Sequence, residues 1–380
     1  KTLRDITSYV TNSVAQSSIT TDTYVTTENM VKDRGGITTY SGELPASAGT
    51  AYKKGDTLVS NIRPYLQKIW LADRDGACSK DVLVFRSINT DSLLPEFLHL
   101  LLWQKDFFDY DMSTFTGTGR PRGDKDELLK YPIPVPTLSE QRALIDDFNR
   151  LTDEINSKRQ QIAALKESVK SRFVEVFGDP VDGKKWPFVR LEDLCTKLGS
   201  GATPRGGKTA YKAEGVPLVR SMNVHNGRFV WKDLACIDDE QAAKLEGVTL
   251  MKGDVLLNIT GASVARSCLL PDELAGGRVN QHVSIVRVDQ KRMLPVLLNT
   301  VLISDSYQRL LLNGSRAAGA TREAITKEAL KRMTVPLPPL ELQQEFASFV
   351  AQVDKSQFAL EQEVDALSAE RDALLDRFLA

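Results

Sequence analysis

The chain has 380 residues, of which 42% are hydrophobic and 26% charged, and its formal net charge is −1. This composition is ordinary for a soluble protein of two or three globular domains. It contains no apolar run near the ~20 residues that cross a bilayer and no signal-peptide pattern, so we expect a cytoplasmic protein. Four scattered cysteines and three isolated histidines predict neither a metal site nor a disulfide framework.

Strand signals recur in both halves of the chain. Short alternating apolar runs predict strands at 81–87, 254–260 and 282–288. The segments 52–60 and 250–258 each contain Lys-Gly-Asp before an apolar run, which predicts a turn that leads into a strand. The two halves therefore share at least part of their strand order.

Helix signals also recur, because 95–112 and 295–312 predict helices at matching positions. Two longer helices follow them, and each has a 4-3 apolar seam of the coiled-coil type. The first begins at a capping box, Thr137 to Glu140, and stops at Gly178 before Pro180. The predicted seam residues are Leu144, Phe148, Leu151, Ile155, Ile162, Leu165, Val169 and Val176, and Phe346, Val350, Val353, Leu360, Val364, Leu367, Leu374 and Phe378.

The two long helices are copies of one pattern, because the same seam recurs 202 residues later, interrupted by Lys158 and Arg172 in the first copy and by Gln357 and Arg371 in the second. The Pro-rich entries align at that offset, including Gln141 with Gln343. We predict globular domains at 1–136 and 179–335 and helices at 137–178 and 336–380. The expected fold class is α+β: two mixed α/β domains separated by an antiparallel two-helix coiled coil with pseudo-twofold symmetry.

Charge is unevenly divided along the chain. Residues 184–335 carry 23 basic and 15 acidic residues, whereas 336–380 carry 3 and 9. A basic domain is what phosphate binding requires, whatever the net charge of the whole chain. Its loops, and those of the first domain, are rich in residue types that contact phosphates and base edges. The predicted DNA-binding residues are Arg63, Tyr65, Lys68, Thr118, Arg120, Arg122, Ser200, Thr203, Arg205, Lys208, Arg220, Asn223, Arg228, Arg316, Thr321 and Arg322.

One loop suggests a different function. Residues 202–209, "ATPRGGKT", fit a loose phosphate-binding loop of an ATP-dependent enzyme. Such a loop needs a buried strand before it and a helix after it. Gly215 and Pro217 would stop any helix within two turns, so an open Gly/Pro-rich loop is the favoured interpretation. No other catalytic motif was found, and we predict no catalytic or metal-binding residues.

The arrangement resembles the specificity (S) subunit of a Type I restriction–modification system over essentially the whole chain. The carriers are "LGSGATPRGGKTAYKAEGVPLVRSMNV" (198–224), "KGDVLLNITG" (252–261) and the helix entries "PIPVPTLSEQ" and "PLPPLELQQE". The resemblance implies two target recognition domains and two conserved helices in a non-catalytic subunit of a prokaryotic defence system. It implies that the chain binds double-stranded DNA at a bipartite target with a fixed spacer. The implied protein partners are two methyltransferase subunits and restriction subunits. S-adenosylmethionine, ATP and Mg would belong to those partners, with no cofactor on this chain.

The first domain departs from the family pattern, because it lacks a clear Gly-Ser-Gly-x-Thr-Pro loop and is not basic. Three alternatives remain open from the residues alone. They are the ATP-dependent enzyme, a coiled-coil adaptor without DNA contact, and an S-like chain that serves another methyltransferase-linked defence system.

Overall fold

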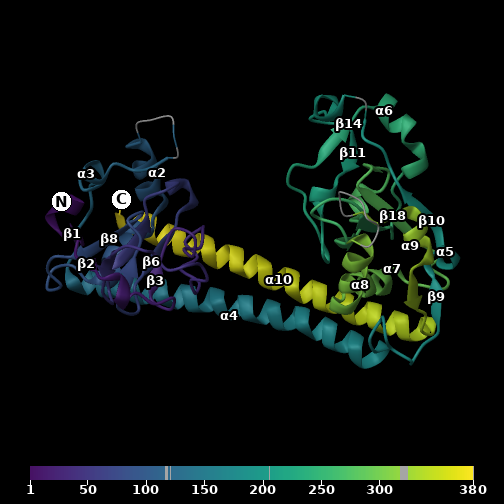
Figure 1. The fold of residues 1–380 in the computed structure, drawn as a ribbon, viewed down its shortest axis with the longest axis horizontal. Coiled ribbons are helices and arrows are strands. Elements are labelled where there is room, and N and C mark those ends of the chain that lie inside the picture. The colour runs from purple at the N-terminus through teal and green to yellow at the C-terminus, as the bar shows by residue number, and fades with distance from the viewer. Residues whose placement is uncertain (116–118, 120, 205, 317–323, 380) are drawn as a thin grey trace. The chain divides into compact units, whose positions relative to one another are not determined.

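The computed structural model describes residues 1–115, 119, 121–204, 206–316 and 324–379, without the side chains of 208, 209, 315, 316 and 379. The chain divides into two compact units (Figure 1). Unit 1 comprises Lys1–Gln160 and Glu361–Ala380, and unit 2 comprises Gln161–Leu360. Each unit therefore contains one globular domain and parts of both long helices, α4 (Leu138–Phe177) and α10 (Leu340–Leu379).

Unit 1 is built on a four-stranded antiparallel sheet in the order β1-β8-β5-β6. Its strands are β1 (Thr7–Tyr9), β8 (Val82–Ser87), β5 (Thr57–Ser60) and β6 (Ile69–Leu71). A second sheet has the order β2-β4-β7-β3, with β2 (Ser13–Val14), β4 (Gly49–Tyr52), β7 (Gly76–Cys78) and β3 (Tyr24–Val25). Three helices complete the domain: α1 (Pro95–Trp103), α2 (Lys105–Ser113) and α3 (Lys125–Leu128). The apolar faces of α1 and α2 share one buried cluster with β5, β6 and β8.

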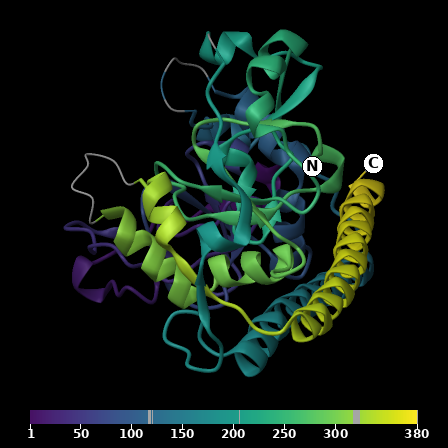
Figure 2. The same ribbon diagram turned by 90° about the vertical axis from the view of Figure 1, so that its right-hand side faces the viewer.

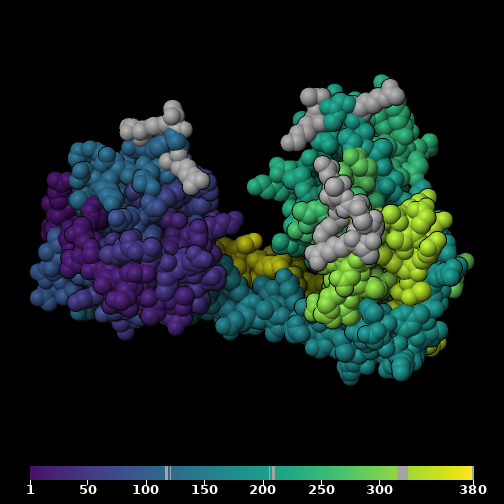
Figure 3. Space-filling view, viewed as in Figure 1, coloured from purple at the N-terminus to yellow at the C-terminus, as the bar shows by residue number. Residues whose placement is uncertain are grey.

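Unit 2 repeats this plan. Its main sheet has the order β10-β18-β15-β16, with β10 (Cys195–Ser200), β18 (Val283–Val288), β15 (Val255–Asn258) and β16 (Ser267–Leu269). Smaller sheets pair β14 (Ala235–Ile237), β11 (Val216–Val219) and β17 (Arg278–Val279), then β12 (Val224–His225) with β13 (Arg228–Phe229), and β19 (Thr334–Pro336) with β9 (Phe188–Arg190). The short helices are α5 (Leu191–Leu194), α6 (Asp239–Lys244), α7 (Pro295–Ile303), α8 (Asp305–Arg316) and α9 (Lys327–Arg332). Helix α8 lies at the surface of the unit (Figure 3), where Leu310 is exposed.

The Lys-Gly-Asp turns hold the two main sheets together in the same way. In unit 1 the guanidinium of Arg86 on β8 donates to both carboxylate oxygens of buried Asp56, at 2.7 and 2.6 Å. In unit 2 Arg287 on β18 makes the equivalent pair with buried Asp254, at 2.7 and 2.9 Å. A forked guanidinium–carboxylate pair fixes direction as well as distance. The predicted turn is therefore also an ion-pair strut between neighbouring strands.

A buried glutamine attaches each long helix to its own domain. The side-chain carbonyl of Gln141 accepts from the Leu94 amide, and its amide donates to the carbonyls of Ser92 and Pro136. Gln343 repeats all three bonds, with the Leu294 amide and the carbonyls of Arg292 and Pro338. Both side chains are fully buried. The sequence alignment of these two glutamines thus corresponds to one duplicated clamp.

Within each unit the two long helices lie side by side, as both ribbon views show (Figures 1 and 2). Lys158 of α4 pairs with Glu363 of α10 in unit 1. In unit 2 the rings of Phe173 and Phe177 of α4 meet Phe346 near the start of α10. A later position on α4 therefore meets an earlier one on α10, and the pairing is antiparallel, as predicted.

The first four seam residues of α4 are buried, whereas most of the others are half-buried. Leu144, Phe148, Leu151, Ile155, Phe346 and Val353 are buried, and the other ten predicted seam residues are half-buried. The prediction missed Phe173, Phe177 and Leu375, which are each 2% exposed. A straight helix drifts ~20° per heptad from a 3.5-residue repeat, so a strict 4-3 count points away from the buried face at the ends. No helix of the described residues is both long and apolar enough to cross a membrane.

Candidate nucleic-acid interface

The loops singled out in the second domain gather at one end of its main sheet. Strand β18 is antiparallel to both β10 and β15, and its start is paired with their ends: Ser284 opposite Ser200, and Val283 opposite Asn258. The loops after β10 and β15 and the segment before β18 must therefore meet. The Ile259 amide donates to the His282 carbonyl at 2.9 Å, and the Ile325 amide to the Ile259 carbonyl at 2.8 Å.

Glycine is required where the loop after β10 passes this end. The Gly201 amide donates to the Asn280 carbonyl, and a Cβ at Gly201 would lie 1.7 Å from the carbonyl oxygen of Val279. No other residue can approach that backbone so closely. Thr203, two residues later, is exposed and donates its hydroxyl to the side-chain carbonyl of Gln281. Ser200 and Thr203 thus lie where the loops meet.

The loop after β11 carries three predicted residues with different environments. The Arg220 guanidinium donates to the Asp233 carbonyl and lies 5.1 Å over the Tyr211 ring. Arg228 is exposed on the short hairpin of β12 and β13. Asn223 is fully buried: its carbonyl accepts from the Arg220 amide, and its amide donates to the carbonyls of Val230 and Lys232. The prediction of a direct contact by Asn223 is therefore corrected, because this side chain shapes the loop instead.

The first domain brings its loops together at the corresponding end of its sheet. The Asn61 amide donates to the Asp81 carbonyl at 2.9 Å, and the Arg63 amide to the Pro121 carbonyl at 2.8 Å. Arg122 pairs with Asp81 at 2.7 Å, and its backbone bridges to Ile62. Tyr65 is 53% exposed on the adjoining turn, so its ring is accessible. The bridge between Ile62 and Arg122 repeats the one between Thr260 and Ala324 in unit 2.

Lys68 is less free than the sequence suggests. Its ammonium donates to the Thr27 carbonyl, and burial lowers the pKa of the amine. Arg63 has a left-handed backbone, with φ of 54°, and an exposed side chain. Of the three, Arg63 and Tyr65 present accessible groups, whereas Lys68 first has to leave a backbone partner.

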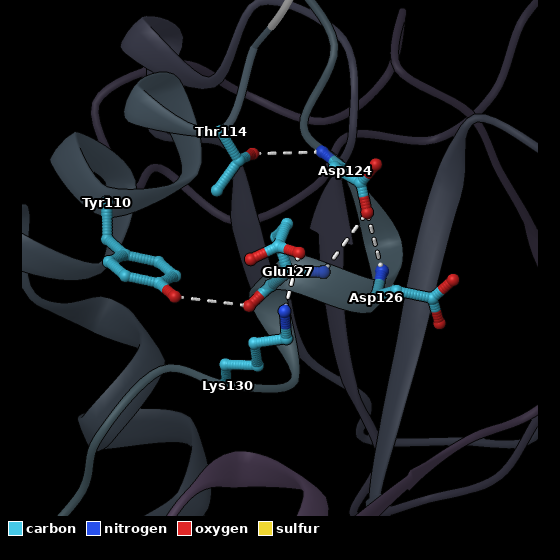
Figure 4. A network of polar contacts seen from close by, with 6 residues as sticks. All are labelled: Tyr110, Thr114, Asp124, Asp126, Glu127 and Lys130. Atoms are coloured by element: carbon cyan, nitrogen blue, oxygen red, sulfur yellow. Dashed lines mark hydrogen bonds and ion pairs between the residues drawn. The ribbon is translucent and has the colours of Figure 1, made fainter.

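The base of the loop that carries Arg122 is closed by a polar network (Figure 4). The Asp124 amide donates to the Thr114 hydroxyl at 2.9 Å, and the Asp124 carboxylate caps α3 through the amides of Asp126 and Glu127. The Tyr110 hydroxyl donates to the Glu127 carbonyl at 3.2 Å. Both ends of the loop are thereby fixed to α2 and α3.

Behind the same loop the sequence analysis missed a buried polar site. Asp111 is fully buried and Asn61 is 3% exposed. Among the residues that the structure describes, neither the Asp111 carboxylate oxygens nor Asn61 Oδ1 has a hydrogen-bond partner. A Cβ at Gly123 would lie 1.6 Å from Asp111 Oδ1. Burial raises the pKa of Asp111 to about 7. The repeat places Leu311, Ile259 and Ile325 at the equivalent positions of unit 2, all in or against its apolar core.

Seven predicted contacts cannot be placed. Thr118, Arg120, Arg205, Thr321 and Arg322 lie outside the described residues, and so do the side chains of Lys208 and Arg316.

The phosphate-loop interpretation of 202–209 does not match the elements that follow it. The loop runs into a four-residue 3-10 turn, Gly207–Ala210, and the next element is strand β11. A phosphate-binding loop directs the N-terminus of an α-helix at the phosphates. No group of three metal-ligating side chains occurs among the residues whose placement is given.

The comparisons with known proteins agree on one family. The model of the type I restriction modification DNA specificity domain matches residues 7–167 and 183–367. The specificity subunit of the type I restriction enzyme MjaVIII from Methanocaldococcus jannaschii is 25% identical over 261 residues, 63% of this chain and 59% of that protein. The EcoKI specificity subunit of Escherichia coli K12 is 22% identical over 274 residues, 65% of this chain and 56% of that protein. The chain thus spans less than two thirds of these relatives.

Two solved structures share the fold across nearly their whole length. A chain from a study of assembly and conformational transition of the type I restriction–modification system has a TM-score of 0.58, 23% identity, and coverage of 99% of this chain and 96% of its own. The S subunit from M. genitalium has a TM-score of 0.58, 13% identity, and coverage of 100% and 95%. With the family model matched over both domains and both helices, the chain belongs to the type I restriction–modification DNA specificity family.

Proposed function

We propose that this chain is the non-catalytic DNA-reading subunit of a type I restriction–modification complex. Each domain would contact one half of a bipartite, asymmetric target in double-stranded DNA, and the long helices would fix the spacer. The observation that carries the proposal is the repeated gathering of polar and basic loops at the same end of the same four-stranded sheet in both units.

The loops differ between the units while the scaffold that holds them does not. The ion-pair struts and glutamine clamps are duplicated, but Asp81 stands in unit 1 where His282 stands in unit 2. Two domains that share a scaffold but differ in their loop residues are suited to contact two different half-sites. Direct readout depends on the side chains that reach base edges, and phosphate contacts only position the protein.

The helices are proposed to dock two methyltransferase subunits, with restriction subunits joining the assembly. Val174 on α4 and Phe358 on α10 are 58% and 61% exposed, and an exposed aromatic side chain such as Phe358 is a candidate contact for a partner subunit. S-adenosylmethionine, ATP and Mg would be bound by those partners. Replacing Phe358 with Ser should weaken co-purification of the methyltransferase, whereas Gln160→Ala at another exposed helix position should not.

The deciding experiment is co-expression of the chain with its methyltransferase partner, followed by mapping of methylated positions across a genome. We expect one two-part sequence with an invariant gap. Methylation without any such sequence, or salt-insensitive binding of DNA by the complex, would contradict the proposal. Adding the restriction subunit then distinguishes a complete restriction system from a methylating system alone.

A further inference from the structure

We infer that Gln281 reads an adenine in the half-site of the second domain, as a specificity residue held in place by Thr203 and His282. The inference rests on the proposed function and names one direct base contact. Gln281 is exposed and lies two residues before β18, where the loops after β10 and β15 meet.

The amide of Gln281 is fixed on both sides. Its carbonyl oxygen accepts the Thr203 hydroxyl, and its nitrogen lies 3.2 Å from Nε2 of His282. An amide nitrogen can only donate, so His282 Nε2 must accept. The imidazole is then neutral with its proton on Nδ1, which lies 2.5 Å from the Thr260 hydroxyl and donates to it. This assignment follows from the hydrogen-bond network.

The backbone under this chain of contacts is also fixed. The His282 amide donates to Oδ1 of Asn280 at 3.0 Å, and Asn280 is 5% exposed. The Asn280 amide in turn donates to the Val219 carbonyl at 3.1 Å. Gln281 is thus held by four segments: the loops after β10 and β15, the end of β11, and its own turn. A side chain ordered before binding loses little conformational entropy on contact.

The groups that remain free match one base. A primary amide has two donor hydrogens and two acceptor lone pairs, and Thr203 and His282 occupy one of each. Within the described part of the chain, the contacts with Thr203 and His282 leave this amide one donor and one acceptor. Adenine presents N7 as an acceptor beside the N6 donor in the major groove, and glutamine pairs with both. The other purine, guanine, presents two acceptors there and would leave the amide carbonyl unpaired.

The test uses methylation mapping with the complete chain and its methyltransferase partner. Gln281→Glu replaces the donor with an acceptor, and should lose about tenfold or more of the preference for adenine at one position, with a shift towards cytosine. Gln281→Ala should relax that position without a new preference. Gln290→Glu, an exposed glutamine beyond the other end of β18, is the matched control and should leave the sequence unchanged.

The outcomes separate this inference from the proposed function. A two-part wild-type sequence that stays the same in both Gln281 variants would overturn the role of Gln281 and leave the proposed function intact. No two-part sequence in the wild type would overturn both. A Gln281 variant that weakens binding to both half-sites equally would assign the residue to structure, and would also contradict the inference. Replacement of His282 with Phe should relax the same position and no other, since it removes only the support of Gln281.

Discussion

Lys158 of α4 and Glu363 of α10 face each other across the helix pair, with Nζ 2.6 Å from the carboxylate. The carboxylate raises the pKa of the lysine. Lys158 interrupts the apolar seam, and a polar seam position can set the register of a helix pair. The residues 202 positions later and earlier in the repeat are Leu360 and Gln161, which cannot form this ion pair. The pair therefore distinguishes the part of the helix pair in unit 1 from its repeat in unit 2.

Charge reversal tests this register role. Lys158→Glu should destabilise unit 1 measurably, because two carboxylates then face each other at a partly exposed site. Combining it with Glu363→Lys should restore most of the loss. Chemical denaturation of the four proteins at low and high salt gives the coupling free energy. Losses in the two single variants that simply add in the double variant would show that the pair makes no net contribution.

The glutamine clamps should contribute more to the free energy of unfolding than the ion pair does. Gln141→Ala removes three hydrogen bonds and leaves the Leu94 amide and two carbonyls without their partner, which should cost about 3 kcal/mol or more. Gln343→Ala should do the same in unit 2. Hydrogen exchange resolved by segment measures each effect, with Gln160→Ala on the exposed face of α4 as the control. A Gln141→Ala protein as stable as the control would contradict the clamp.

Asp111 should make unit 1 less stable as the pH rises. Its pKa is raised from 3.8 to about 7 in the folded state, so the folded chain binds the proton more tightly than the unfolded chain. Stability falls between these two values, by up to ~4 kcal/mol, and then levels off. Asp111→Asn removes the titration, so its advantage over the wild type should be absent near pH 4 and largest above about pH 7. Thermal unfolding of both proteins across this pH range measures the difference in stability. A difference that stays constant with pH would refute the raised pKa of Asp111.

Matched insertions test the helices as a spacer. Seven residues added after Gln160 in α4 and seven after Leu360 in α10 preserve the ion pair of Lys158 with Glu363. They lengthen each helix by ~10 Å at about 1.5 Å per residue, or about three base pairs at ~3.4 Å each. Methylation mapping should show the same half-sites with a longer gap. An unchanged gap would rule out the helices as the ruler, and insertion in α4 alone should destabilise the pair.

Repetition made much of this fold predictable. The offset between Gln141 and Gln343 and the two Lys-Gly-Asp turns marked equivalent positions before any coordinates, and the helix entries followed from local capping chemistry. Phe173 and Phe177 were missed because a fixed 4-3 count ignores both helix drift and the domain packed beside that end. The site was harder, because Asn223 and an exposed arginine look alike in a list of polar loop residues. Only the hydrogen bonds and burial of the side chain show that the amide of Asn223 points inward.

The buried triplet of Asp111, Asn61 and Gly123 had no sequence signal of its own. Each residue is common in loops and helix ends, and Asn61 is far from the other two in the chain. They stand out only when the two repeats are compared, because the second repeat has Leu311, Ile259 and Ile325 at the equivalent positions. Gln281 and His282 were likewise passed over, because an isolated histidine is normally a packing residue and its partners come from distant loops.

The duplicated arginine–carboxylate struts also bear on how such a chain can diversify. Asp56 with Arg86 and Asp254 with Arg287 tie the sheet interior together without help from the loops at its end. Those loops can therefore accept substitutions, insertions or replacement by other loops, because the ion pairs that stabilise the sheet lie in its interior. Under the proposed function, new sequence preferences could then arise in one domain at a time, while the other domain keeps its own half-site.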